Sequence, residues 1–420
     1  MSRLGFLVLL LIIYLGFDIY TFYGLSSLTT AQSFFCSFYW MISAIVLAGF
    51  YKVSQDLQRF KGGVRPLSTN LLLGFGFAVF IGKILFSGLL LTQDLGRLVL
   101  GVVNIFSTTT AELTGTNGIP SRQKIITLIS AILVAIPFFS MLYGMTVGKY
   151  RYTVDNLKLS FQDLPQSFNG FKIIQISDIH SGTFDSIEQV RKGVDLIMEQ
   201  KPDMILFTGD LVNSNKNEID PYINTFASLS APYGMYSVMG NHDYYGMYKI
   251  PKGDYASKSA YLADFNNKHK RMGFEIMNNS SKTITKGNDT IRLVGVENWG
   301  AGPFPKKGNL SIALEGVLDY EFSILMSHDP THWDHHVLKH PKKIHLTLAG
   351  HTHGMQFGID FLGIKWSPVK YRYRRWMGIY KELDQYLYVN RGFGFLAWPG
   401  RVGMRPEITL IELEKEKQAN

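Results

Sequence analysis

The chain has 420 residues, of which 46% are hydrophobic and 18% are charged, and its formal net charge at pH 7 is +9. Its single cysteine, Cys36, excludes an intrachain disulfide and a zinc site built on thiolates. A chain of this length is too long for one ordinary core, so we expect at least two structural units.

Four apolar windows lie in the first 150 residues, and each has about the 20 residues that cross a bilayer. They span residues 5–23, 33–51, 70–92 and 125–147. We therefore predict an all-α region of four transmembrane helices over residues 1–149. A cleaved signal peptide is a weaker interpretation of the first window, because no small-residue cleavage site follows it.

Basic residues in the loops predict the orientation, because Lys and Arg favour the cytoplasm. The loop after the second window holds Lys52, Arg59, Lys61 and Arg65, whereas the loop after the first window has no charge. This difference places both ends of the region, and the rest of the chain, on the cytoplasmic side. The third loop has basic residues that favour the opposite orientation: Arg97, Arg122 and Lys124.

Two charged residues, Asp18 and Lys83, lie inside the predicted spans. An ionisable residue in a span is a functional candidate, because burying its charge is costly. Asp18 lies near a helix end, and Lys83 could pair with it inside the bundle or reach a watery cavity. We favour a structural role and keep a transport role as the alternative.

Short runs rich in Ile, Val and Leu alternate with helical patterns from Phe171 onward, which predicts an α/β or α+β layered fold. Five of these runs end in residues of metal-ligand type. "FKIIQISDIH" ends in Asp178 and His180, "MILFTGD" in Asp210, "GMYSVMGNHD" in Asn241, His242 and Asp243, "FSILMSHDP" in His328, and "IHLTLAGHTHG" in His351 and His353. The carboxyl ends of strands meet where sites form, so we expect one shared pocket.

Asp, His and Asn without Cys form a ligand set suited to Mn²⁺, Fe or Zn²⁺. The Asp-x-His and His-x-His spacings can each present two ligands to one cavity, because residues two apart in an extended chain point to the same side. The sequence therefore predicts a metal site at these strand ends.

These motifs, in this order, resemble those of the calcineurin-like metallophosphoesterases, and the resemblance runs from about Leu157 to Leu413. "GHTHGMQFG", "YLYVNRGFGF" and "RPEITLIEL" are similar to the bacterial branch that carries membrane spans ahead of the catalytic domain. The resemblance implies a four-layer αββα sandwich over residues 150–420. It also implies a metal-dependent phosphoric ester hydrolase with a binuclear metal centre, for which Mn²⁺ is favoured and Fe or Zn²⁺ are the alternatives.

The resemblance also implies roles for individual residues, carried over by motif. Asp178, His180 and His353 would bind one metal, Asn241, His328 and His351 the other, and Asp210 both. A hydroxide that bridges the metals would attack the phosphorus. His242 would stabilise the phosphate charge and protonate the leaving oxygen. Asp243 would orient the His242 imidazole or raise its pKa, and Asn241 would also contact the substrate.

The substrate is expected to be a phosphodiester or pyrophosphate, in a phospholipid or a lipid-linked nucleotide. The family includes enzymes that hydrolyse the pyrophosphate of UDP-diacylglucosamine, some of them in membrane-attached branches. Arg391, which follows a strand, could reach the substrate phosphate. The alternative is a transport or sensor membrane protein in which the phosphoesterase domain is regulatory.

Nucleic acid is not an expected partner, because residues 151–420 hold 32 Lys and Arg against 29 Asp and Glu. The stretch "KWSPVKYRYRRWMGIYK" mixes basic and aromatic residues, which indicates either a membrane-interface surface or core aromatics beside a solvated charged edge. The pattern does not predict an oligomeric state.

A second histidine array occurs in "DPTHWDHHVLKH", where His332, His336 and His340 stand at four-residue steps. This spacing is typical of one helix face, either a metal site or a solvated surface. We favour the solvated face, because no Glu stands between the histidines, and we expect Asp329 and Pro330 to begin the helix.

Overall fold

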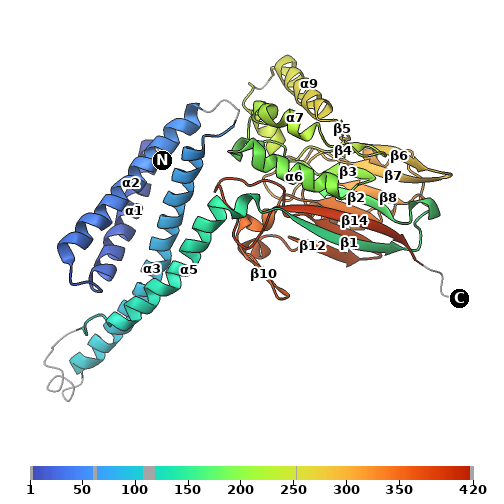
Figure 1. The fold of residues 1–420 in the computed structure, drawn as a ribbon. Helices are drawn as coiled ribbons and strands as arrows, with labels where there is room; N and C mark the ends of the chain where they lie inside the picture. Colours follow the sequence, from blue (N-terminus) through green and yellow to red (C-terminus); the bar gives the residue numbers. More distant parts are fainter. Residues whose placement is uncertain (1–2, 60–63, 107–118, 252, 417–420) are drawn as a thin grey trace. The chain divides into compact units, whose positions relative to one another are not determined.

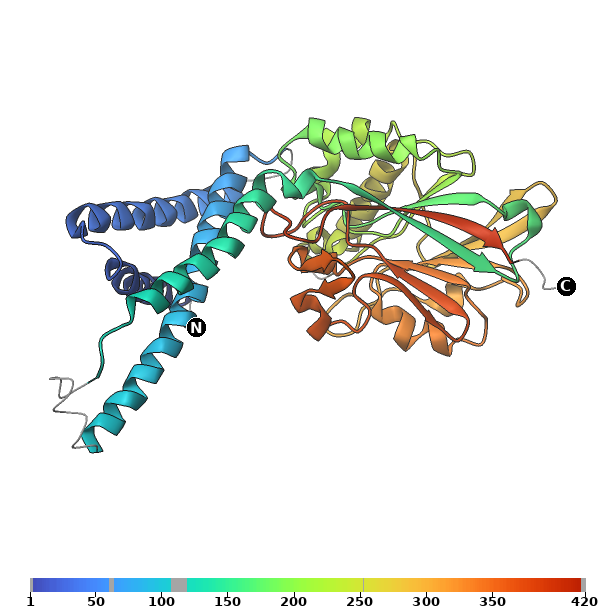
Figure 2. The same cartoon turned by 60° about the horizontal axis from the view of Figure 1, so that its bottom comes forward.

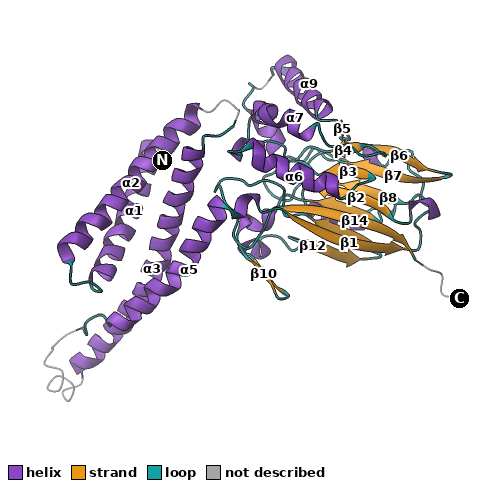
Figure 3. Ribbon diagram, viewed as in Figure 1, coloured by secondary structure: helices purple, strands orange, loops and turns teal. Residues whose placement is uncertain are grey.

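The computed structural model describes residues 3–59, 64–106, 119–251 and 253–416, so Lys61 lies outside the described residues. The chain forms two compact units. One contains residues 1–58 and 71–143, and the other contains residues 59–70 and 144–420. Every strand of the described residues lies in the second unit (Figure 3).

The N-terminal region is helical (Figure 1). Its helices are α1 (Arg3–Ser26), α2 (Gln32–Arg59), α3 (Leu67–Phe106) and α5 (Lys124–Thr146). Within the described ranges, three segments are long and apolar enough to cross a membrane, namely Gln32–Arg59, Leu67–Asn104 and Lys124–Thr146. The first helix has a shorter apolar stretch, Leu11–Ser26, so a fourth span stays a prediction.

The two charges predicted inside the spans form a buried ion pair in the first unit. Lys83 Nζ of α3 lies 2.5 Å from Asp18 Oδ1 of α1. From α2, Tyr39 and Ser43 donate hydroxyl hydrogen bonds of 2.7 and 2.9 Å to the same carboxylate oxygen. Because each charge has an opposite charge and hydroxyl partners, this cluster supports the structural interpretation.

Two six-stranded sheets form the framework of the second unit (Figure 2). The first sheet has the order β1 (Thr153–Phe161), β14 (Glu407–Lys415), β2 (Phe171–Ile176), β3 (Met204–Phe207), β4 (Met235–Ser237) and β5 (Glu275–Ile276). The second has the order β12 (Gly378–Glu382), β13 (Gln385–Val389), β9 (Leu346–Ala349), β8 (Ser323–Met326), β7 (Asp289–Gly295) and β6 (Ser280–Lys286).

Alternating side chains of the strands pack in different cores. Ile173 of β2 lies in a fully buried cluster with Ile291 and Ile324 of the second sheet, whereas its neighbour Ile174 packs with Val194 of a helix. This period of two follows from the pleat. The helices contribute side chains to the two other clusters, which do not lie between the sheets. They are α6 (Ile187–Glu199), α7 (Ile223–Phe226), α8 (Tyr245–Tyr248) and α9 (Tyr255–Arg271) beside the first sheet, and α10 (Leu310–Ala313) and α11 (Thr331–His335) beside the second.

Parallel pairing brings the carboxyl ends of the central strands to one edge of each sheet. In the first sheet β2, β3 and β4 are parallel, and in the second β7, β8 and β9 are parallel. The loops that follow these strands carry the predicted ligands. A separate antiparallel hairpin, β10 (Ile359–Phe361) and β11 (Ile364–Trp366), follows the loop after β9.

Candidate metal centre

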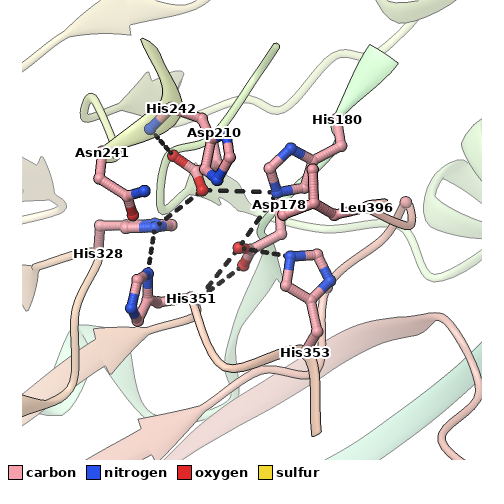
Figure 4. Close-up of polar contacts among 12 residues, drawn as sticks. Asp178, His180, Asp210, Asn241, His242, His328, His351, His353 and Leu396 are labelled. Atoms are coloured by element: carbon pink, nitrogen blue, oxygen red, sulfur yellow. Dashed lines mark hydrogen bonds and ion pairs between the residues drawn. The ribbon is translucent and has the colours of Figure 1, made fainter. Parts of the chain in front are cut away.

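The predicted ligands converge from both sheets (Figure 4). Asp178 follows β2, Asp210 follows β3, and His328 and His351 follow β8 and β9. Asp178, His180 and His328 have no solvent-exposed surface, and Asp210 is 1% exposed. Side chains that are this polar and this deeply buried need partners that replace water.

The first ligand group consists of Asp178, His180 and His353, whose ligand atoms all lie within 4.8 Å of one another. His353 Nε2 is 3.2 Å and His180 Nε2 is 3.9 Å from Asp178 Oδ1. Both oxygens of Asp178 also accept hydrogen bonds from the His351 backbone N–H, at 3.1 and 2.9 Å. This contact ties the two metal-ligand loops of the two sheets together.

The second ligand group consists of Asp210, His328 and His351, whose ligand atoms also lie within 4.8 Å of one another. His328 Nε2 is 3.3 Å from His351 Nδ1. Figure 4 shows the side chain of Asn241 beside His328. All seven residues predicted as ligands are therefore brought to one place.

Asp210 lies between the two groups. Its Oδ2 is 3.4 Å from His180 Nε2 in the first group and 3.2 Å from His328 Nε2 in the second. Its other oxygen, Oδ1, accepts a 2.8 Å hydrogen bond from the His242 backbone N–H. One carboxylate oxygen is thus positioned to serve both groups.

Unpaired buried polar atoms indicate that the site suits cations. His180 Nε2, His353 Nε2 and Asn241 Oδ1 are buried and have no hydrogen-bond partner among the described residues. Such atoms are rare in folded proteins unless an ion or water completes them. Imidazole nitrogens with carboxylate and amide oxygens fit divalent Mn, Fe or Zn.

The second nitrogen of three ligand histidines is held by a neighbour. His180 Nδ1 is 3.0 Å from Asn213 Oδ1, His328 Nδ1 is 2.8 Å from the Thr208 carbonyl oxygen, and His351 Nε2 is 2.8 Å from the Tyr373 hydroxyl. These contacts turn the remaining nitrogen of each ring toward the ligand groups. Metal-binding histidines are commonly oriented in this way.

Electrostatics favours the metal-binding protonation state at His180, His351 and Asp178. Burial lowers the pKa of His180 and of His351, which keeps both imidazoles neutral. Burial alone would raise the pKa of Asp178, but the nearby His353 and His328 hold it well below its usual range. Neutral imidazole and ionised carboxylate are the forms that coordinate a cation. Burial would lower the pKa of His328, but the Asp210 and Asp178 carboxylates raise it to about 10, so a cation bound there would have to displace a proton.

The ligand loops have unusual backbone geometry. The φ angles of Asp178, His180, Asp210, His351 and His353 lie between 46° and 71°, in the left-handed region. Glycines allow the close approach of these loops, since a Cβ on Gly350 would lie 1.9 Å from Ser177 Oγ and one on Gly240 would lie 2.2 Å from Asp210 Oδ1. A side chain at either glycine would displace the site.

His242 and Asp243 have separate surroundings. The imidazole Nδ1 of His242 is 2.7 Å from the Asn213 carbonyl oxygen, and the two rings of His180 and His242 have centroids 4.9 Å apart. The Asp243 carboxylate instead accepts backbone hydrogen bonds from Asp210, Leu211, Val212 and Gly240. Asp243 therefore holds the Asp210 loop, and Asn213 rather than Asp243 orients the His242 ring.

Arg391 lies in an acidic cluster. Its Nε is 2.5 Å from Glu407, and its two terminal nitrogens are 3.0 Å from Asp360 and 2.5 Å from Asp155. The side chain is buried, and all three guanidinium nitrogens are paired with carboxylates. This pairing gives Arg391 a structural role that the sequence did not predict and leaves the predicted phosphate contact without support.

Two residues near His351 were not predicted as part of the site. Asp329 is fully buried, and its Oδ2 is 3.4 Å from His351 Nε2, beside the Tyr373 hydroxyl. Asp329 was predicted as the N-cap and Pro330 as the first helical residue, but α11 begins at Thr331 with Pro330 as its N-cap. The Asp329 Oδ1 accepts a hydrogen bond from the Thr331 N–H. Its position directly after the predicted ligand His328 could have indicated that Asp329 lies near the metal site.

The second histidine array does not form one helix face. Helix α11 ends at His335, and His332 is 1% exposed, with Nδ1 2.9 Å from Ser327 Oγ. The prediction of a solvated face is therefore wrong for His332, which packs inward against Trp299. No metal-ligand group was found there within the part of the chain that the structure describes.

Comparisons with known proteins match both halves of the chain. Residues 171–355 match the family model described as Calcineurin-like phosphoesterase, and residues 2–149 match the one described as Probable Calcineurin-like phosphoesterase, transmembrane domain. The Uncharacterized metallophosphoesterase YkuE of Bacillus subtilis is 31% identical over 254 residues, which cover 60% of this chain and 82% of that protein.

Two further relatives have informative names. A Transmembrane protein with metallophosphoesterase domain from Danio rerio is 27% identical over 70% of this chain, which spans 63% of the length of that relative. The UDP-2,3-diacylglucosamine pyrophosphatase LpxG of Chlamydia trachomatis is 28% identical over 59% of this chain and 86% of that protein.

Proposed function

The chain belongs to the calcineurin-like metallophosphoesterases, and we propose that it is a membrane-anchored hydrolase that cleaves a phosphodiester or pyrophosphate bond with two divalent metal ions. The observation that carries this proposal is the position of Asp210 Oδ2, which lies within 3.4 Å of a ligand histidine from each group. A shared carboxylate is what a binuclear centre needs.

The proposed ligands divide between the two ions. Asp178, His180 and His353 hold one ion, Asn241, His328 and His351 hold the other, and Asp210 is shared. When bound, the ions neutralise phosphoryl oxygens and lower the pKa of an attacking water. Mn²⁺ is the ion we favour, with Fe and Zn²⁺ as alternatives.

His242 is the proposed general acid. Its Nδ1–H donates to the Asn213 carbonyl oxygen at 2.7 Å, which leaves Nε2 to protonate the leaving oxygen. Its backbone N–H donates to Asp210 Oδ1 at 2.8 Å. The acid is therefore held in a fixed position relative to the shared carboxylate.

The proposed substrate is a lipid or a lipid-linked nucleotide. The catalytic chain follows α5 directly, since the short helix Gly148–Tyr150 and strand β1 begin within seven residues of Thr146. A relative that matches over 59% of this chain is named for its action on UDP-2,3-diacylglucosamine. A site tethered this closely to a bilayer suits a substrate that is held there.

We place residues 1–149 in a transmembrane region with four spanning helices and residues 150–420 in a cytoplasmic catalytic domain of the four-layer type. The Arg65 backbone N–H donates to the Phe184 carbonyl oxygen at 3.0 Å, and Asn70 Nδ2 donates to the Thr183 carbonyl oxygen at 2.9 Å. The basic loop before α3 therefore lies on the same side of the membrane as the catalytic domain. Its positive charge favours the cytoplasm.

Hydrolysis by the purified full chain tests the proposal. In detergent with Mn²⁺, the chain should hydrolyse bis(p-nitrophenyl) phosphate, and more efficiently UDP-2,3-diacylglucosamine. His242→Ala should lower kcat by about 10²–10⁴-fold, the usual contribution of general acid catalysis. Asp210→Asn should abolish activity, while Asp319→Asn, an exposed control of the same type, should leave it unchanged. Full activity of Asp210→Asn, or no hydrolysis with any divalent metal, would refute the proposal.

A further inference from the structure

The hairpin formed by β10 and β11 exposes large apolar side chains at its tip. Phe361 is 68% exposed, Leu362 is 84% exposed and Ile364 is 61% exposed. We call these three residues the hairpin tip. Figure 1 shows the hairpin projecting from the body of the catalytic unit. A cluster of exposed apolar side chains at a protruding turn indicates a surface that is covered by an apolar partner.

Basic side chains flank the hairpin tip. Lys365, Lys370, Arg372 and Arg374 are exposed, and we call them the basic flank. The only acidic residue between positions 355 and 374 is Asp360. Its Oδ2 lies 3.0 Å from Arg391 Nη1, so this carboxylate is already neutralised. Arg374 lies 4.0 Å from Asp334 and 3.9 Å from Glu382, so the positive charge of the segment comes chiefly from Lys365, Lys370 and Arg372.

The base of the hairpin is bonded to the end of a candidate membrane span. Gly144, two residues before the end of α5, accepts a 3.2 Å backbone hydrogen bond from Arg401. The next residue, Val402, pairs through its backbone with Gln356 and Gly358 at 2.8 and 2.9 Å. A Cβ on Gly144 would lie 2.7 Å from the Arg401 carbonyl oxygen, so the chains meet closely. The base of the hairpin therefore lies beside the C-terminal end of α5, within the catalytic unit.

The same segment also contacts the metal-ligand loop. Ser367 Oγ donates a 2.8 Å hydrogen bond to the Gly354 carbonyl oxygen, and the Tyr373 hydroxyl is 2.8 Å from His351 Nε2. One continuous stretch thus connects the exposed tip to a ligand of the second group.

We propose that the hairpin tip inserts into the interface of the bilayer that anchors the chain, while the basic flank meets anionic lipid headgroups. Phe, Leu and Ile gain free energy by leaving water for the acyl region, and basic residues near an anionic surface add electrostatic attraction. The observation that selects lipid over a protein partner is the hydrogen-bonded continuity between the hairpin base and Gly144 of α5.

Fluorescence of the full chain in vesicles tests this insertion. Leu362→Cys is made in a Cys36→Ser background, labelled with an environment-sensitive fluorophore, and reconstituted into phosphatidylcholine vesicles with and without phosphatidylglycerol. Leu383→Cys is the matched control, because Leu383 is 70% exposed in the turn between β12 and β13. That turn lies at the sheet edge opposite the ligand loops, since β13 is parallel to β9.

The expected result is a blue shift at position 362 and quenching by lipids that carry a spin label near the headgroup, strongest in anionic vesicles, with neither effect at position 383. Absence of lipid quenching at position 362 in both vesicle types would overturn the proposal. Equal quenching with neutral lipid would overturn the role of the basic flank. A blue shift that grows with the protein-to-lipid ratio without lipid quenching would assign the tip to a second copy of the chain. The measurement needs no turnover, so it is independent of the proposed hydrolase activity, and unchanged thermal melting of Leu362→Cys controls for folding.

Discussion

The two histidines of the Gly-His-Thr-His-Gly loop face different ligand groups although one residue separates them. His351 Nδ1 is 3.3 Å from His328 Nε2, whereas His353 Nε2 is 3.2 Å from Asp178 Oδ1. Both residues have φ angles in the left-handed region, which turns the two side chains apart. A change at either residue therefore concerns one proposed metal more than the other.

His351→Ala and His353→Ala should each weaken one of two metal-binding steps. We expect a Mn²⁺ titration of the full chain, followed by calorimetry, to resolve two steps in the unchanged protein. Each variant should lose a different step, because each removes an imidazole from a different group. His335→Ala, an exposed control, should keep both steps. Identical titration curves for the two variants would contradict the assignment of the two groups.

Asp329→Asn should weaken metal binding without removing a ligand. Its carboxylate lies 3.4 Å from His351 Nε2, and loss of such a partner commonly costs about 10–100-fold in metal affinity or activity. Tyr373→Phe, which removes the other contact of the same nitrogen, should have a smaller effect in the same direction. Full metal affinity in Asp329→Asn would show that the Tyr373 hydroxyl is sufficient.

Much of the site could be predicted from sequence because its residues follow recognisable strands. Asp178, Asp210, His328 and His351 each come two or three residues after a buried run, and parallel strands bring such positions together. The surroundings of these residues could not be predicted, because they depend on pairings between distant segments. Arg391 was expected to face a phosphate, yet its partners come from positions 155, 360 and 407.

At the scale of elements, three helices of the first unit meet at one buried ion pair. Lys83 comes from α3, Asp18 comes from α1, and the hydroxyls of Tyr39 and Ser43 come from α2. A mixed α/β domain after an apolar helical region was predictable from hydropathy and periodicity. The pairing of these particular helices was not, because hydropathy does not encode which polar positions face one another.

Removal of one charge from this pair should destabilise the helices more than removal of both. Lys83→Met leaves the Asp18 carboxylate buried and unpaired, and breaking a buried pair in this way costs about 3–5 kcal/mol. The double variant Asp18→Asn, Lys83→Met should recover most of that loss. Thermal unfolding of the full chain in detergent, followed by circular dichroism, measures both changes. Lys52→Met is the control, because its partner Asp56 forms an exposed pair of small energetic value.

At the scale of the whole molecule, the catalytic unit includes chain from two places in the helical region. Residues 59–70 and residues from Gly144 onward both belong to it. Lys149 forms a buried ion pair with Asp185 at 2.5 Å, and Asn70 also donates to Asp185, at 2.7 Å. Both segments therefore meet at one carboxylate, five residues after the predicted ligand His180.

The predicted topology can be read from chemical labelling of expressing cells. In a Cys36→Ser background, a membrane-impermeant maleimide should label Thr30→Cys, in the loop after α1, in intact cells. Tyr320→Cys, whose parent side chain is 80% exposed in the catalytic unit, should be labelled after the membrane is opened. This outcome follows from the positive charge of Lys52, Arg59, Lys61 and Arg65, and from the backbone hydrogen bond between Arg65 and Phe184 within the catalytic unit. Labelling of Tyr320→Cys in intact cells would place the catalytic domain outside.

Five ligand residues have φ angles in the left-handed region, so the geometry of the metal centre depends on the rest of the fold. An L-residue in this conformation is less stable than in its preferred ones by about 1 kcal/mol or more, so an isolated loop would relax away from it. The hydrogen bonds of the surrounding loops hold this conformation, such as those from the His351 N–H to Asp178 and from the Asp210 N–H to Asp243. A short peptide with the same motif sequence would lack these surrounding contacts, and its histidines and aspartates would not be arranged to bind two ions.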